Sequence, residues 1–211
     1  MLARKVVTRR GRRFRGYFPS TKLGRMVAWE SLLERDAILL LEFSPGVLSY
    51  QEQPVLIKYS DGNCMRDYYP DFELELVNGK RVHVEVKTAK QLTKPVFAAK
   101  YKAIAEHYLR IRQDYRIVTE AEICREPLQT NLRTLVYLLG RKGHALPNTR
   151  LLEEKLGMSE LQYSDVEKEL GKDTTLRLLA LGRLECDLTL PLAGDTPVLV
   201  SKGERNATVL F

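Results

Sequence analysis

Two segments of alternating apolar and polar residues, separated by Asn78-Gly79, constrain this chain more than any other feature. Successive side chains of a strand point to opposite faces of a sheet, so strict alternation predicts two strands joined by a tight turn. The first segment, 69–77, has apolar side chains on one face and acidic ones on the other, and the second, 81–87, has three valines on one face. The polar faces carry Asp71, Glu73 and Glu75 on the first strand, and His83, Glu85 and Lys87 on the second.

The register of this hairpin follows from keeping the two apolar faces together. A two-residue turn would place Phe72 opposite Glu85 and so mix apolar with charged side chains on one face. A three-residue loop with Gly79 at positive φ pairs Phe72 with Val84 instead. The same register brings Asp71 opposite Glu85, and two opposed carboxylates require a cation between them. The other expected pairs are Leu74 with Val82, Glu73 with His83, and Glu75 with Arg81.

The residue types available narrow the kind of metal that could lie between these carboxylates. The three cysteines and three histidines are scattered, with no C-x-x-C spacing, which argues against a disulfide framework or a zinc ribbon. Carboxylates would have to hold any metal, and they favour hard cations such as Mg²⁺ or Mn²⁺.

A third carboxylate is expected from a long helix predicted from Ser20 or Thr21 to about Glu42. Glu34 lies inside the apolar stripe of this helix, where an isolated charge needs a partner. Glu30 falls in the same stripe, so helical periodicity does not choose between the two.

The order of the remaining elements indicates an α/β fold with a mixed sheet. After the first helix, strands are expected at 47–50, 54–59, 69–77 and 81–87, then a helix at 95–112 and a strand at 115–119.

From about residue 126 the sequence changes to short amphipathic helices followed by two apolar runs. This order predicts either a small winged helix-turn-helix domain or an ordinary helical cap on the first domain. The helices are expected at 128–139, 150–156, 161–170 and 175–181, and the apolar runs at 184–190 and 197–200. The expected helix ends are an N-cap at Asn148, a capping box of Ser159 with Gln162, and stops at Gly140, Gly157 and Gly171.

The positive charge is concentrated at the N-terminus. The net charge is +7, and residues 1–29 contain nine Lys and Arg but no acidic residue. Such an arm is attracted to a polyanion, although a solvated tail is the alternative interpretation. The expected organisation is a basic arm at 1–20, a domain with the candidate metal site at 21–125 and the C-terminal domain at 126–211. The candidate nucleic-acid contacts are Arg9, Arg10, Arg12, Arg13, Arg15 and Lys22.

No apolar run approaches the roughly 20 residues needed to span a bilayer, and no apolar segment of a secretory signal follows the basic N-terminus. A soluble protein that stays inside the cell, without a membrane partner, is therefore expected.

Asp71 followed by Glu85-Val86-Lys87 resembles the Pro-Asp and Glu-x-Lys pattern of the restriction-endonuclease-like nuclease superfamily. A longer set of segments is similar to TnsA, the endonuclease subunit of heteromeric Tns-type transposases. These segments are 29–36, 41–43, 50–54 and 69–72, and the resemblance extends over about residues 20–120. It implies a restriction-endonuclease-like mixed sheet flanked by helices.

The resemblance also implies an activity and its residues. The catalytic helix Glu of the family falls on Glu34, its metal-binding Asp on Asp71, and its Glu/Gln-x-Lys pair on Glu85 and Lys87. These carboxylates, with the carbonyl of Val86, would hold Mg²⁺, and Lys87 would orient or deprotonate the attacking water.

The implied reaction is cleavage of the 5′ ends, the non-transferred strands, of a transposon. A DDE transposase, TnsB, would cut the 3′ ends, and an AAA+ regulator, TnsC, would be a further partner. Such a protein is expected in the bacterial cytoplasm, associated with the nucleoid.

Two other functions fit the same residues. A stand-alone restriction or repair endonuclease of the same superfamily would cleave DNA without partners. A non-catalytic DNA-binding scaffold would leave Lys87 an ordinary exposed strand lysine, and Lys87→Ala would then not change strand cleavage.

Overall fold

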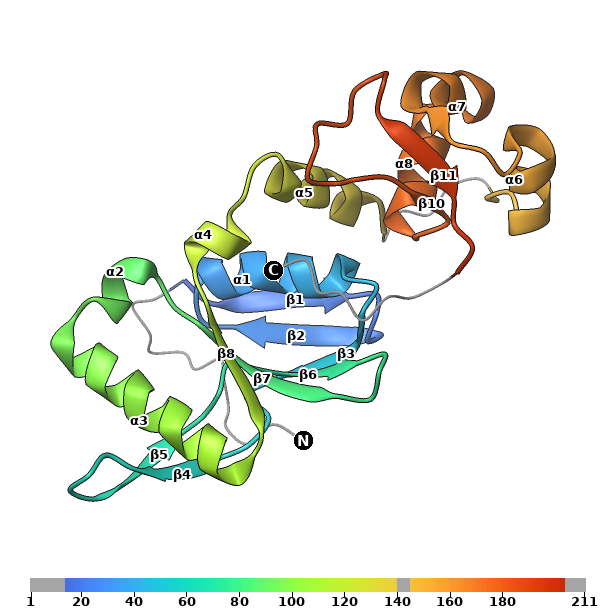
Figure 1. The fold of residues 1–211 in the computed structure, drawn as a ribbon. Coiled ribbons are helices and arrows are strands. Elements are labelled where there is room, and N and C mark those ends of the chain that lie inside the picture. The colour runs from blue at the N-terminus through green and yellow to red at the C-terminus, as the bar shows by residue number, and fades with distance from the viewer. Residues whose placement is uncertain (1–13, 140–144, 204–211) are drawn as a thin grey trace. The chain divides into compact units, whose positions relative to one another are not determined.

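The computed structural model describes residues 14–139 and 145–203 of the chain (Figure 1). These residues form two compact units, and the chain passes from one to the other between Cys124 and Arg125. Within the described ranges, no helix is both long and apolar enough to cross a membrane.

A mixed four-stranded sheet lies at the centre of the first unit, as the sequence predicts. Its strand order is β3-β6-β7-β8, with β7 and β8 parallel and the other neighbours antiparallel. The strands are β3 (Val47–Glu52), β6 (Phe72–Leu76), β7 (Arg81–Val86) and β8 (Asp114–Val118).

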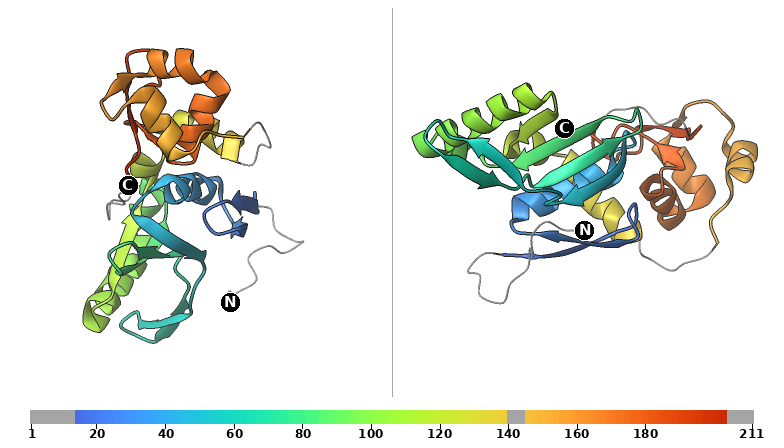
Figure 2. Two further views of the ribbon diagram at one scale, coloured as in Figure 1. Left: turned by 90° about the vertical axis from the view of Figure 1, so that its right-hand side faces the viewer. Right: turned by 90° about the horizontal axis from the view of Figure 1, so that it is seen from below.

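The two longest helices of the described first unit pack against this sheet (Figures 1 and 2). Helix α1 (Leu32–Phe43) contacts β3 and β7, and α3 (Pro95–Ile111) contacts β8. Tyr101 of α3 contacts Glu85, so the alternate valines of β7 point to the other face of the sheet. The short helices α2 (Ala89–Leu92) and α4 (Glu120–Ile123) flank α3 and β8 in the chain.

The prediction that the first helix begins at Ser20 or Thr21 is wrong. A hairpin of β1 (Gly16–Ser20) and β2 (Arg25–Trp29) occupies this segment, and α1 begins only at Leu32, after its N-cap Ser31. The hairpin turn contains Gly24 at φ +63°, a backbone conformation that interrupts a right-handed helix.

A second hairpin packs against α3. It consists of β4 (Ile57–Ser60) and β5 (Met65–Tyr68), and only β4 overlaps a predicted strand. Three of the four residues of β5 are exposed, so the strand lacks the apolar alternation by which it could be recognised.

The β6–β7 hairpin has the predicted register. Phe72 pairs with Val84 and Glu73 with His83. Gly79 has φ +79°, and the amide of Leu76 donates to the carbonyl of Lys80 across the loop at 2.9 Å. Two further predicted pairs, Leu74 with Val82 and Glu75 with Arg81, are also present. For the fifth predicted pair, Asp71 with Glu85, Asp71 lies just before β6, outside the paired residues.

The second unit consists of short helices and a small antiparallel sheet of order β10-β11-β9. Its elements are α5 (Leu128–Leu139), α6 (Thr149–Leu156), β9 (Leu161–Gln162), α7 (Tyr163–Leu170), α8 (Lys172–Ala180), β10 (Leu184–Glu185) and β11 (Pro197–Val200).

Most of the predicted helix ends in the second unit are confirmed. Asn148 caps α6 by accepting from the amide of Leu151, and Gly157 and Gly171 follow the ends of α6 and α7. Gly140 lies outside the described residues. The predicted capping box of Ser159 with Gln162 is wrong, because Gln162 belongs to β9 and pairs with Pro197 of β11.

Candidate active site

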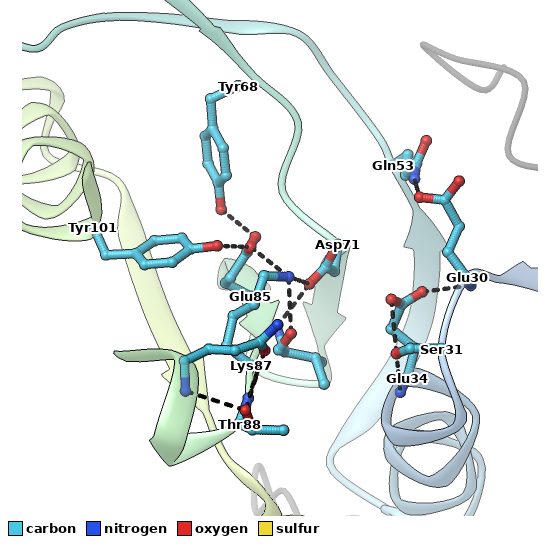
Figure 3. Close-up of polar contacts among 12 residues, drawn as sticks. Glu30, Ser31, Glu34, Gln53, Tyr68, Asp71, Glu85, Lys87, Thr88 and Tyr101 are labelled. Atoms are coloured by element: carbon cyan, nitrogen blue, oxygen red, sulfur yellow. Dashed lines mark hydrogen bonds and ion pairs between the residues drawn. The ribbon is translucent and has the colours of Figure 1, made fainter. Parts of the chain in front are cut away.

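Three of the predicted site residues come together where β6 begins and β7 ends. Asp71 immediately precedes β6, Glu85 lies near the end of β7, and Lys87 follows that strand (Figure 3). Because β6 and β7 are paired neighbours, the hairpin register alone brings the two acidic residues to the same edge of the sheet.

The ammonium group of Lys87 lies between the two carboxylates. Its Nζ is 2.8 Å from Oε1 of Glu85 and 3.1 Å from Oδ2 of Asp71, and it donates to the carbonyl of Val86 at 2.9 Å. Asp71 Oδ2 also accepts the amide of Val86 at 2.8 Å. In this structure Lys87 supplies the cation that the opposed carboxylates require.

Burial and mutual charge set the protonation of this cluster. Only 15% of the Asp71 side chain is exposed, and its pKa is well above the ordinary value because of burial and the nearby charge of Glu85. Burial lowers the pKa of Lys87, but the charges of Asp71 and Glu85 outweigh it and raise this pKa overall. Lys87 is therefore an ammonium at neutral pH and not a ready proton acceptor while both carboxylates hold it.

Two tyrosine hydroxyls bind the carboxylate of Glu85. Tyr68 at the end of β5 donates to Oε2 and Tyr101 on α3 donates to Oε1, each at 2.6 Å. Burial, and then the charge of Glu85, raise the pKa of both phenols, which keeps them protonated as donors.

Glu34 lies apart from this cluster, at the start of α1. Its carboxylate accepts the amide of Glu30 at 2.8 Å and the hydroxyl of Ser31 at 2.9 Å, so it takes part in the N-terminal cap of the helix. Burial raises its pKa, and the positive charge of Lys87 acts in the opposite direction. Figure 3 shows Glu34 and Glu30 on the far side of Asp71 from Glu85.

Glu30, predicted to share the apolar stripe with Glu34, precedes the N-cap of α1 and is held by a different contact. Its Oε2 accepts the side-chain amide of Gln53 at 3.3 Å. Gln53 is buried and has φ +40°, and its backbone amide donates to the carbonyl of Asp71 at 2.9 Å. A buried non-glycine residue at positive φ stores backbone strain, and here it connects Glu30 to Asp71.

The donor chemistry of the cluster fits a hard cation. Oxygens of Asp71, Glu85 and Val86 already surround one positive charge, that of Lys87, and such oxygens are the ligands that Mg²⁺ prefers. Among the described residues, no group of three or more His, Cys, Asp and Glu side chains is close enough to hold a metal. The predicted third carboxylate, Glu34, is therefore not gathered with the other two.

The predicted nucleic-acid contacts have mixed outcomes. Arg9, Arg10, Arg12 and Arg13 lie outside the described residues, and Arg15 is half-buried just before β1. Lys22 donates from Nζ to the carbonyls of Leu41, Ser44 and Val47 at 2.7–2.8 Å. These three bonds use every ammonium proton of Lys22, so its side chain stabilises the end of α1 and has no donor left for DNA.

Sequence reasoning did not find Tyr68, Tyr101 or Gln53. One signal was present for Tyr101, which shares the buried face of α3 with Ile104 and Tyr108 and needs a partner for its hydroxyl. The sequence carries no comparable signal for Tyr68 or for the positive φ of Gln53.

Comparison with known proteins supports a nuclease. No curated protein matches the chain. Residues 44–120 match the family model described as TnsA-like endonuclease N terminal. The matched range contains Asp71, Glu85 and Lys87, and it begins after Glu34. Residues 44–120 of this chain are therefore similar to the TnsA-like endonuclease N-terminal family, which supports a TnsA-like nuclease.

Proposed function

We propose that this chain is the DNA endonuclease subunit of a cut-and-paste transposase and cleaves the 5′ ends of the transposon. The observation that carries the proposal is the cluster of Asp71, Glu85 and Lys87 within the TnsA-like segment. Two buried carboxylates beside a fixed lysine are suited to metal-assisted hydrolysis of a phosphodiester.

Asp71, Glu85 and the carbonyl of Val86 would hold Mg²⁺ or Mn²⁺. Glu34 of α1 lies apart from them in this structure, but its charge acts on Asp71, so we propose it as a further carboxylate of the site. When bound, the metal polarises the scissile phosphate and lowers the pKa of the attacking water. Lys87 is held by hydrogen bonds beside these ligands, so its ammonium can orient the water and offset negative charge on the phosphate.

The helices that follow β7 provide a surface for the DNA backbone. Residues 88–112, which contain α2 and α3, have six basic residues and one acidic residue. Four of the basic side chains precede the middle of α3, close in sequence to Lys87, and phosphate contacts of this kind position a duplex without reading its sequence. The six basic residues are Lys90, Lys94, Lys100, Lys102, Arg110 and Arg112.

The second unit suits a protein partner better than DNA. Residues 125–205 contain twelve basic and twelve acidic residues, so this unit lacks the positive excess of a DNA-binding surface. We assign residues 126–211 to a winged-helix-like domain that contacts the AAA+ regulator TnsC, while the nuclease acts beside the DDE transposase TnsB. The helices and short antiparallel strands of the second unit support this assignment.

Asp71→Ala tests the nuclease assignment in a reaction that contains TnsB, TnsC and transposon DNA. Cleavage at the 5′ ends should stop while TnsB still cuts the 3′ ends, so the products remain linked to the donor DNA. Asp67→Ala, at an exposed acidic residue of β5, is the matched control and should cleave normally. Release of the element by cutting of both strands in Asp71→Ala would show that Asp71 is not a ligand.

Two further results would replace this function with an alternative. Cleavage of plasmid by the purified chain without partners would indicate a stand-alone endonuclease. Unchanged 5′ cleavage in the presence of Lys87→Ala would indicate a non-catalytic DNA-binding scaffold.

Deletion of residues 126–211 tests the assignment of the second unit. The truncated chain should lose binding to TnsC, measured by pull-down, and should still bind Mn²⁺ through Asp71 and Glu85. Full affinity for TnsC after the deletion would contradict the assignment.

A further inference from the structure

Glu85 is the most buried side chain of the cluster. Only 3% of its side chain is exposed, and each of its carboxylate oxygens accepts a hydrogen bond from a different tyrosine. The two tyrosines come from separate elements, β5 and α3, and approach Glu85 from different directions (Figure 3). Glu85 is therefore held from two directions.

This arrangement fixes the plane of the carboxylate. The last torsion of a glutamate side chain is broad and has no sharp preference of its own. A hydrogen-bond donor on each oxygen removes that freedom. Each carboxylate oxygen has two lone pairs, and Oε2 uses one of them to accept the bond from Tyr68, so its second lone pair remains for a metal. Residues that hydrogen-bond a metal ligand without touching the metal orient it in this way.

The tyrosine rings are themselves fixed by their neighbours. Lys100 places Nζ 5.5 Å from the ring centre of Tyr68 and 5.2 Å from that of Tyr101. Tyr59 packs edge-to-face on Tyr68, with the ring centres 6.3 Å apart. Packing against Lys100 and Tyr59 orients the rings, so the hydroxyl bonds to Glu85 are an addition to ordinary core packing and can be tested separately.

We infer that Tyr68 and Tyr101 are positioning residues, which hold the Glu85 carboxylate in the orientation that binds the catalytic metal. This inference rests on the proposed function. The tyrosines touch neither DNA nor metal in this role and act only through Glu85.

The test compares Mn²⁺ binding to Tyr68→Phe, Tyr101→Phe and the control Tyr59→Phe. Calorimetry on the full chain measures affinity without any need for DNA or partners. Each of the first two variants should bind Mn²⁺ about 10–100-fold more weakly, the range found when hydrogen bonds to a metal ligand are removed. Tyr59 lies in the same buried cluster but does not contact Glu85, so Tyr59→Phe should bind like the wild type.

A double-mutant cycle with Glu85→Ala separates positioning from general stability. If the tyrosines act through Glu85, Tyr68→Phe should cause no further loss of Mn²⁺ affinity once Glu85 is absent. An equal loss in both backgrounds would overturn the inference, as would wild-type affinity in both single variants. Thermal unfolding identifies any variant that does not fold, and because Tyr68 and Tyr101 bind different oxygens, either one alone can carry the test.

Mn²⁺ binding by Asp71→Ala shows whether a negative result concerns only the role of the tyrosines or the proposed metal site itself. If Asp71→Ala binds Mn²⁺ as the wild type does, the metal site itself is wrong. If Asp71→Ala loses the metal while both Phe variants keep it, the site stands and only the role of the tyrosines is rejected.

Discussion

Glu73 and His83 face each other across β6 and β7, with Oε2 and Nε2 2.9 Å apart. This pair belongs to the register that also brings Asp71 and Glu85 to one edge of the sheet. Because a shift of one residue would turn every side chain of β7 to the opposite face, the cluster of Asp71, Glu85 and Lys87 depends on the turn that sets this register.

Gly79→Val should destabilise the first unit by about 1–2 kcal/mol, because a β-branched residue at positive φ is strained. Apart from the two chain neighbours of Gly79, no atom of the described residues lies within 4 Å of the position that a Cβ would take here, so the strain would come from the backbone and not from a clash. Urea denaturation measures the loss, and Mn²⁺ affinity should fall with it. Asn tolerates positive φ, so Gly79→Asn is the control, and equal stability of the two variants would contradict the explanation.

Lys22→Met should lower stability by roughly 1–3 kcal/mol, because three carbonyls at the end of α1 and the start of β3 lose a charged donor. Thermal unfolding checks the size of the effect. The affinity of the folded variant for DNA, and its dependence on salt, should stay unchanged, whereas a reduced salt dependence would show that Lys22 contacts phosphate after all.

Asp71→Asn should raise the stability of the protein in EDTA by roughly 1 kcal/mol, because one ammonium, Lys87, then no longer has to neutralise two buried carboxylates. Asn can still accept the amide of Val86, so that bond is kept. Excess Mg²⁺ should raise the unfolding temperature of the wild type but not that of the variant. A variant less stable than the wild type in EDTA would contradict this account.

Cys186 should react slowly with alkylating reagents at pH 8. Burial, and then the negative charge of Asp187, raise its pKa to about 11, so only about one thiol in a thousand is ionised at that pH. In a Cys64→Ser/Cys124→Ser background, mass spectrometry should show a rate that rises about tenfold per pH unit up to pH 11. Asp187→Asn should react faster, and a rate that levels off near pH 9 would refute the raised pKa.

The two strands of the site could be predicted because the pattern that determines them lies within one short segment of the sequence. Alternation assigned Phe72 and Glu85 to opposite faces, and one glycine accommodated the loop, so pairing followed without knowledge of the rest of the chain. Segment 16–29 has no such alternation, so its local sequence is compatible with either a helix or a hairpin. Val27 fits the stripe of a helix, but it also pairs with Phe18 in a hairpin that buries both side chains.

The contacts around Glu85 could not be predicted because they depend on packing between distant segments. Tyr68 and Tyr101 reach Glu85 only when β5 and α3 lie beside the end of β7. Nothing in the spacing of these residues specifies that arrangement. Glu34 was assigned to the metal site by the family resemblance. In the structure its carboxylate instead accepts hydrogen bonds from the amide of Glu30 and the hydroxyl of Ser31, at the start of its own helix.

The connections on the two sides of β7 differ greatly in length. Residues 77–80 join it to β6, whereas residues 87–113 separate it from β8. A short loop loses less chain entropy on closing, so we expect the β6–β7 hairpin to form early during folding and the parallel pairing with β8 to follow. Asp71 and Glu85 would then meet before α3 has docked, and a chain still being synthesised would hold both acids while lacking Tyr101.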